Sequence, residues 1–261
     1  CLASNGALKL KYLVLNNNQI GDQGATVIGQ ALASNGAWEL KELLLYRNQI
    51  GDRGATAIGQ ALACNAALKL EKLWLNNNQV GDQGAAAIGQ ALASNRPLEL
   101  QKLRLGYNQI GDQGTTAIGH ALASNGALQL TSLCLERNQI GDAGATAIAG
   151  YLKSDGASNL TTLFLGGNKI GDTGATAIGQ VFAPDRGAIN FFHVSRRALK
   201  LTYLSLCNNM VGDAGATAIG QALELYRRAR YSVSNVAIHL SFNPISLSTK
   251  HMFASDPQLV F

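Results

Sequence analysis

The feature that most constrains this chain is a motif that recurs with a period of 30 residues. The motif reads Leu-x-x-Leu-x-Leu-x-x-Asn-x-Ile/Val-Gly-Asp-x-Gly, and its first six copies begin at Leu10, Leu40, Leu70, Leu100, Leu130 and Leu160. A seventh copy begins at Leu201, and a weaker eighth is marked by Ile238, Leu240, Asn243 and Ile245. A period of this length is typical of one supersecondary unit stacked on copies of itself. The chain is therefore predicted to form a solenoid with a long, continuous core.

Each repeat is predicted to contain one short strand and one helix. Leu13 and Leu15 alternate with outward positions, which indicates a strand with one buried face. The turn Gly21-Asp22-Gln23-Gly24 follows and leads into a helix. We expect Asp22 to be the N-cap, with its carboxylate accepting from amides of its own helix.

A strand that returns to the next strand through a helix makes neighbouring strands parallel. Strands pair about 4.8 Å apart, whereas helices pack about 8–10 Å apart. The helical layer must therefore be wider, and the stack is predicted to curve with strands on the concave side and helices on the convex side. We expect the Asn column that starts at Asn18 to satisfy backbone groups of its own turn and of the next repeat.

The repeated Asn-x-Ile-Gly-Asp-x-Gly-Ala, with Leu-x-x-Leu-x-Leu ahead of it, resembles the ribonuclease-inhibitor type of leucine-rich repeat. That type also occurs in NOD-like receptors and in Ran GTPase-activating protein. The resemblance covers roughly residues 1–182 and 199–245. It implies an α/β leucine-rich-repeat horseshoe that recognises proteins, as the sensing or inhibitory part of a larger protein.

Composition excludes several other classes of protein. Hydrophobic residues make up 47% of the chain and charged residues 14%, so a disordered chain is excluded. Every apolar run is shorter than the roughly 18 residues that a membrane-spanning helix needs, so no membrane span is predicted. The four cysteines lack metal-ligand spacing, and Cys134 and Cys207 are expected roughly 10 Å apart, too far for a disulfide. We expect reduced thiols, a cytoplasmic location, a monomer, and neither a metal nor a cofactor.

The outward strand positions vary between copies while the framework hardly changes. One such column reads Val14, Leu44, Trp74, Arg104, Cys134, Phe164, Ser205 and His239. Aromatic and arginine side chains are enriched where proteins bind proteins. The predicted partner-binding residues on the concave face are Tyr46, Arg47, Trp74, Arg104, Tyr107, Arg137 and Phe164.

Three alternatives to protein recognition remain open at this stage. The resemblance also implies a GTPase-activating regulator of the Ran type, whose functional residues do not map onto this chain. A passive scaffold or decayed array without a ligand would show the same variation. Lys72, Lys102, Arg104 and Arg137 could attract nucleic acid, but Glu42, Glu71 and Glu136 interrupt them, and no nucleophile accompanies the histidines. We therefore predict a protein without catalytic residues.

The ends of the array are less regular than its middle. The repeat domain is predicted to span 1–245, with an insertion near 183–198 that delays the seventh copy until Leu201. A degenerate tail, 246–261, follows, and we expect little order after about Ser248. The chain starts at Cys1 in mid-repeat, so we expect it to be part of a longer protein.

Overall fold

The computed structural model describes residues 10–34, 39–65, 67–94, 99–125, 129–154, 157, 159–183, 199–228 and 236–261. The predicted insertion near 183–198 lies outside the described residues except for Ala183.

Short strands alternate with helices along the described residues. The strands are β1 (Tyr12–Val14), β2 (Glu42–Leu44), β3 (Lys72–Trp74), β4 (Lys102–Arg104), β5 (Ser132–Cys134), β6 (Thr162–Phe164), β7 (Tyr203–Ser205), β8 (Ala237–His239) and β9 (Leu259–Val260). The helices are α1 (Asp22–Ala33), α2 (Asp52–Cys64), α3 (Asp82–Ala93), α4 (Asp112–Ser124), α5 (Asp142–Lys153), α6 (Asp172–Gly179), α7 (Asp213–Arg228) and α8 (Leu247–Met252).

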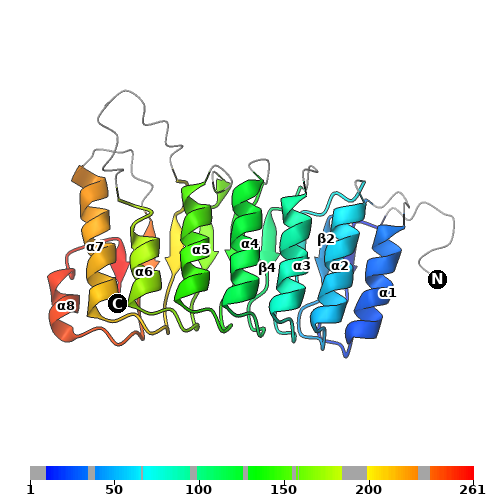
Figure 1. The fold of residues 1–261 in the computed structure, drawn as a ribbon, viewed down its shortest axis with the longest axis horizontal. Helices are drawn as coiled ribbons and strands as arrows, with labels where there is room; N and C mark the ends of the chain where they lie inside the picture. Colours follow the sequence, from blue (N-terminus) through cyan, green and yellow to red (C-terminus); the bar gives the residue numbers. More distant parts are fainter. Residues whose placement is uncertain are drawn as a thin grey trace, which may run out of the picture.

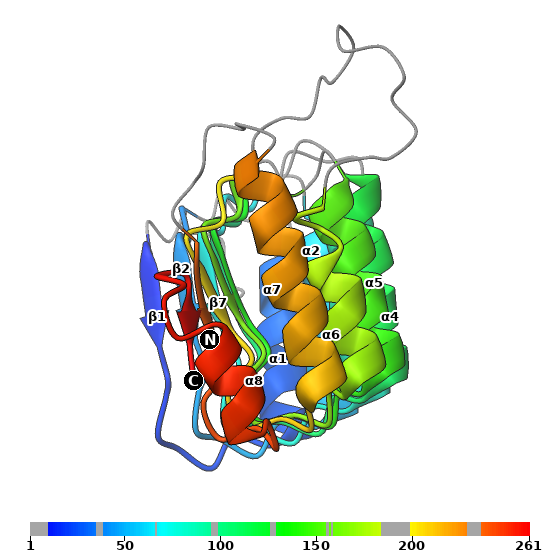
Figure 2. The ribbon, with the colours of Figure 1, turned by 90° about the vertical axis from the view of Figure 1, so that its left-hand side faces the viewer.

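Strands and helices form two separate layers of one solenoid. Within the described residues, the nine strands form one parallel sheet in chain order. From β1 to β8, equivalent positions of successive repeats are paired. Figure 1 shows the helices side by side in one row, with the strands behind them. Figure 2 shows that α4 and α5 stand farther out than α1 and α7, so the stack curves with its strands inside. The predicted curved α/β solenoid is confirmed.

The core lies between the two layers and is built from the repeated apolar positions. Leu43 and Leu45 point inward from one repeat, and both are fully buried. Ile58 and Leu62 cover them from the helical side with at most 2% of their surface exposed. The same positions are buried in the following repeats, so one continuous apolar layer holds the array together.

The repeated aspartate does not cap its own helix, and that prediction is wrong. The helix begins at Asp22 itself, and Gly21 at the N-cap makes no side-chain cap bond. One carboxylate oxygen of Asp22 instead accepts from the backbone N–H groups of Gly51 and Gly54, both at 2.8 Å. The same pair of bonds recurs for Asp52, Asp82, Asp112, Asp142 and Asp172. Each aspartate therefore caps the helix of the following repeat.

The asparagine column joins repeats in the opposite direction. The amide of Asn48 donates to the carbonyl oxygens of Leu45, in its own turn, and of Leu15, in the preceding repeat. Its oxygen accepts from the N–H of Ile20 in that same preceding repeat. The expected link is thus present but runs backward along the chain, because the side chain lies over the turn of the repeat before it.

Glycines at one helical position let neighbouring helices approach closely. A Cβ atom added at Gly119 would lie 2.9 Å from the carbonyl oxygen of Ala147 on α5. Equivalent contacts occur for Gly29, Gly59 and Gly89, each against backbone of the next helix. Gly150, one turn from the end of α5, has open space where its Cβ would be. Glycine is therefore needed at Gly29, Gly59, Gly89 and Gly119, where the next helix comes this close, although α5 carries Ala149 at the equivalent position. Packing places no such constraint on Gly150.

The C-terminal segment is ordered, so the predicted low order after Ser248 is wrong. Helix α8 follows the last asparagine turn, and β9 pairs with β8 through two backbone bonds from Ile238 and Leu240. The ring of Phe253 lies against Gly220, where the next full helix would pack. Asp213 continues the aspartate series by accepting from the N–H of Ser246 at 2.8 Å. The segment packs against the last full repeat although its sequence lacks the repeat motif.

The aspartate bonds predict a specific loss of stability. Replacing Asp112 by Ala removes the acceptor of two backbone N–H groups and leaves both in a partly buried site. We expect the free energy of unfolding to fall by about 2 kcal/mol, measured by urea denaturation. The exposed neighbour Gln113, replaced by Ala, is the control and should change stability by less than about 0.5 kcal/mol. Equal losses in both variants would contradict the assigned role of the carboxylate.

Two glycine-to-alanine substitutions on the helices are expected to act in opposite directions. Alanine is about 1 kcal/mol better than glycine inside a helix. Gly150→Ala gains this preference without a clash, and thermal unfolding should move to higher temperature. Gly119→Ala meets the backbone of α5, so we expect a net loss of about 1–2 kcal/mol. A stabilised Gly119→Ala variant would show that the helices are not held in close contact.

Candidate functional site

The concave face consists of the outward side chains of β1–β8 and of the second and third residues that follow each strand. Alternation along each strand directs these side chains away from the core. All seven predicted residues lie on this face: Arg47, Arg104, Tyr107 and Arg137 are exposed, and Tyr46, Trp74 and Phe164 are half-buried. The structure does not gather them into one group, because they divide between two clusters and the turns beside them.

Three of the predicted residues form the Trp74 cluster, defined here as Tyr46, Trp74 and Arg104. The rings of Tyr46 and Trp74 have centroids 5.9 Å apart and are tilted at 51°. The guanidinium carbon of Arg104 lies 4.3 Å from the centroid of the Trp74 ring, which is cation–π geometry. These contacts cross from β2 to β4 and present one aromatic and cationic surface.

Hydrogen bonding in the Trp74 cluster is incomplete. Among the described residues, the indole N–H of Trp74 and the amide oxygen of Asn76 are buried without a hydrogen-bond partner. An unsatisfied buried polar group costs about 1–3 kcal/mol. The scaffold does not require either side chain, because other repeats carry Leu, Cys or Ser in the Trp74 position and Tyr, Gly or Glu in the Asn76 position.

The turns beside the strands carry the second predicted pair, Tyr107 and Arg137. The guanidinium carbon of Arg137 lies 5.4 Å from the centre of the Tyr107 ring. Both residues have positive φ, 55° and 49°, as does Arg47 at 54°. The equivalent residues in other repeats include Asn17, Asn77, Asn208 and Gly167. Asn and Gly adopt this left-handed conformation more readily than Tyr or Arg.

Phe164 lies apart from the other predicted residues and belongs to a second group, the Phe164 cluster. Its ring centroid is 5.3 Å from that of Tyr203, and Tyr203 is 4.8 Å from the ring of His239. The sequence prediction omits Tyr203 and His239. His239 occupies the same outward column as Trp74, Arg104 and Phe164, whereas Tyr203 belongs to the outward column that starts at Tyr12, from which no residue was chosen. The repeat alignment therefore already contained the signal for both residues.

Small residues separate the two clusters. Gly106, Cys134 and Gly166 are buried between them. The half-buried Glu136 side chain lies over Gly106, whose added Cβ would come within 2.9 Å of the Glu136 Cγ. Burial raises the pKa of the Cys134 thiol to about 11. The centre of the face therefore holds a protonated thiol beside one carboxylate.

Charged side chains border the clusters, and only some of them are paired. Lys72 contacts Glu42 at 2.6 Å, and Lys41 contacts Glu71 at 2.5 Å. The hydrogen bond and charge of Glu71 raise the pKa of Lys41. Within the described part of the chain, no carboxylate forms an ion pair with Arg47, Lys102, Arg104 or Arg137. These four cations give the face an uncompensated positive charge.

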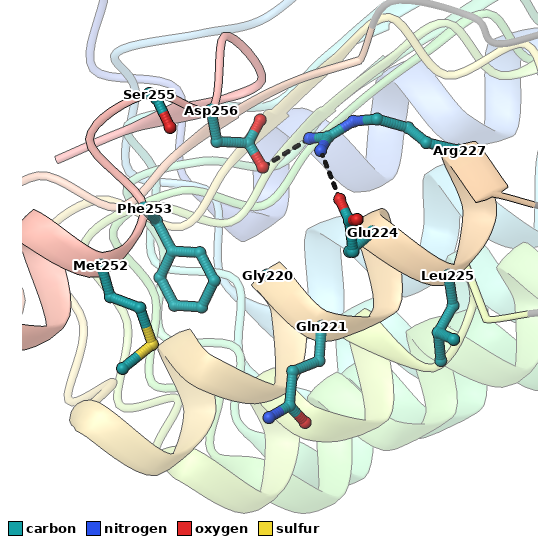
Figure 3. A pocket seen from close by; sticks show the side chains of 9 residues that line it. All are labelled: Gly220, Gln221, Glu224, Leu225, Arg227, Met252, Phe253, Ser255 and Asp256. Atoms are coloured by element: carbon teal, nitrogen blue, oxygen red, sulfur yellow. Dashed lines mark hydrogen bonds and ion pairs between the residues drawn. The ribbon is translucent and has the colours of Figure 1, made fainter.

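Other candidate sites in the described residues are weaker. No group of His, Cys, Asp and Glu there could hold a metal ion. A pocket of about 610 Å³ lies between α7 and the C-terminal segment, lined by Gly220, Leu225, Met252 and Phe253 among others (Figure 3). Arg227 crosses it and donates to Glu224 at 3.1 Å and to Asp256 at 2.5 Å. We interpret this pocket as the incomplete junction between the last full helix and the short α8.

Comparison with known proteins settles the family. The profile described as "Leucine Rich repeat" matches residues 7–29, 40–59, 67–89, 100–119, 129–149, 156–179 and 198–220, more than half of the chain. The chain belongs to the leucine-rich repeat family. Repeats of this family generally mediate protein–protein interactions. A search of curated protein sequences gave no match.

A solved structure supports the leucine-rich-repeat fold. The chain is similar to the crystal structure of an internalin C2 from Listeria monocytogenes, with a TM-score of 0.52 and 21% sequence identity. The alignment covers 96% of this chain and 79% of the internalin. At this identity the similarity concerns the fold alone. In the described residues, no helix has the length and apolar character needed to cross a membrane.

The buried thiol predicts a selective chemical reactivity in this leucine-rich repeat protein. At a pKa of about 11 instead of the ordinary 9.0, the thiolate population of Cys134 at pH 8 is about 100-fold lower. We expect iodoacetamide at pH 8 to modify the exposed Cys64 well before Cys134, as measured by peptide mass spectrometry over time. A Cys64→Ser variant controls for peptide assignment. Equal labelling rates would contradict the burial of Cys134.

Proposed function

We propose that this leucine-rich repeat chain is a non-catalytic recognition module that binds a protein partner on its concave face. The binding residues are Tyr46, Arg47, Trp74, Arg104, Tyr107, Arg137 and Phe164. By resemblance to the ribonuclease-inhibitor type, the module serves within a larger sensor or regulatory protein.

The observation that carries this proposal is the choice of residue at the left-handed turn positions. A non-glycine residue in this conformation costs about 1–2 kcal/mol, and Asn relieves part of that cost by local hydrogen bonding. Arg47, Tyr107 and Arg137 nevertheless occupy it, with φ between 49° and 55°. Strained positions of this kind concentrate at binding sites, because the side chain serves a purpose other than stability.

The two aromatic clusters add independent support. Aromatic and arginine side chains supply most of the binding energy at protein interfaces when a partner desolvates them. The Trp74 cluster holds such side chains in fixed mutual contact, so little conformational entropy is lost on binding. The reduced thiols of Cys134 and Cys207 suit a reducing, cytoplasmic environment. We propose a monomer, which sedimentation of the purified chain would test.

Two other functions lead to different results in solution. A GTPase-activating regulator of the Ran type would accelerate GTP hydrolysis when added to small GTPases. A passive scaffold would bind no partner through the concave face. Among the described residues, no specific contact favours either function.

Affinity capture with matched variants tests the proposed function. The wild-type chain serves as bait, and Trp74→Ala with Arg104→Ala serves as the concave variant. Gln60→Ala with Gln90→Ala is the control, because both residues are exposed on convex helices. A protein retained by wild type and control is then purified, and its Kd is measured by calorimetry. We expect the concave variant to raise this Kd about tenfold or more. Unchanged binding, or loss in the convex control, would contradict the proposal.

A further inference from the structure

Resting on the proposed function, we infer that the partner presents carboxylate side chains to the Trp74 cluster and to the Tyr107–Arg137 pair. The ligand class is an acidic protein segment, and Arg104 and Arg137 are its principal contacts. This inference concerns the chemistry of the partner, which the family membership leaves open.

The orientation of the two arginines favours this ligand. Arg104 lies 4.3 Å from the centre of the Trp74 ring, and Arg137 lies 5.4 Å from that of Tyr107. A guanidinium held against a ring keeps its N–H donors at its edge, where they can bind both oxygens of a carboxylate. Neither guanidinium group donates a hydrogen bond or forms an ion pair within the described residues. Both edges therefore remain available to a partner.

The surrounding charges point to the same ligand. Lys102 and Arg47 are exposed on the same face and are also without a carboxylate partner among the described residues. The carboxylates at the border, Glu42 and Glu71, are already matched by Lys72 and Lys41. A positive field of this kind accelerates and orients the approach of an acidic protein.

Glu136 distinguishes an acidic protein from a nucleic acid. Its side chain lies at the centre of the face, over Gly106, and no cation forms an ion pair with it in the described part of the chain. A continuous phosphate backbone crossing the face would pass this carboxylate and be repelled. A protein segment can place an N–H donor there between its acidic side chains.

Tryptophan fluorescence offers a direct test with defined probes. The Trp38→Leu background leaves Trp74 as the single tryptophan, and Leu already stands at the Trp38 position in other repeats. Poly-L-glutamate is the probe, and poly-L-lysine and oligothymidylate are the comparisons, at low ionic strength. We expect poly-L-glutamate to change the Trp74 emission at the lowest concentration of the three, and added salt to weaken this binding.

Two substitutions and one control assign the effect to named side chains. Arg104→Gln and Arg137→Asn should each raise the Kd for poly-L-glutamate about fivefold. Arg53→Gln, an exposed arginine on convex α2, should leave it unchanged. Arg137→Asn should keep or raise the unfolding midpoint, because Asn occupies the same turn position with φ near 55° in the third repeat. Lost affinity in that variant would then not reflect unfolding.

Four results would overturn the inference of an acidic ligand. Tighter binding of oligothymidylate than of poly-L-glutamate would assign the face to phosphate, and tighter binding of poly-L-lysine would assign it to a basic partner. Unchanged affinity in both arginine variants would also overturn the inference. A captured partner that requires Trp74 but tolerates Arg104→Gln and Arg137→Asn would retain the proposed function while excluding the acidic ligand.

Discussion

The structure depends on side chains that bind the backbone of neighbouring repeats. The aspartates that begin α1 to α6 each accept from two glycine N–H groups of the following repeat. Each asparagine of the buried column bonds to the turn of the preceding repeat. The two links run in opposite directions, so every internal repeat is tied on both sides. They fix the position of helices and strands relative to their neighbours. The sheet register and the close approach of the helices at glycine follow from that position.

Because of this arrangement, the side chains on the concave face are not needed for the stability of the fold. The leucines form the core, and the asparagine and the aspartate make the bonds between repeats. The outward strand positions contribute to neither. Aromatic and arginine side chains gather on some repeats, and small residues separate the two clusters. The turn positions show that these choices are costly, since Arg47 and Tyr107 stand where Asn would fit the backbone better. Different positions of the same repeat therefore serve the stability of the fold and the proposed recognition of a partner.

The sequence predicted the architecture because the period and the alternation of leucines act over short distances. It failed for Asp22, because the nearest amides in sequence belong to its own helix, whereas the nearest in space belong to the next repeat. It failed for the C-terminal segment, because Phe253 and β9 complete the stack through contacts that have no periodic signature. Phe164 shares the predicted surface with Trp74, although its neighbours are Tyr203 and His239. Alternation predicts which side chains face outward, but not which of them touch.

The direction of the bonds between repeats has a consequence for how such an array can change its length. The spacing from the first leucine to the aspartate is the same in the sixth copy, Leu160 to Asp172, as in the seventh, Leu201 to Asp213. The interval between those two copies is nevertheless longer than the usual period. This insertion thus lies between the aspartate of one copy and the first leucine of the next, and it leaves the spacing from leucine to aspartate unchanged. Duplicating a segment exactly one repeat long preserves the aspartate and asparagine bonds between repeats, wherever in the repeat the segment begins. The number of repeats can therefore change, whereas the order of leucines, asparagine and aspartate within each repeat cannot.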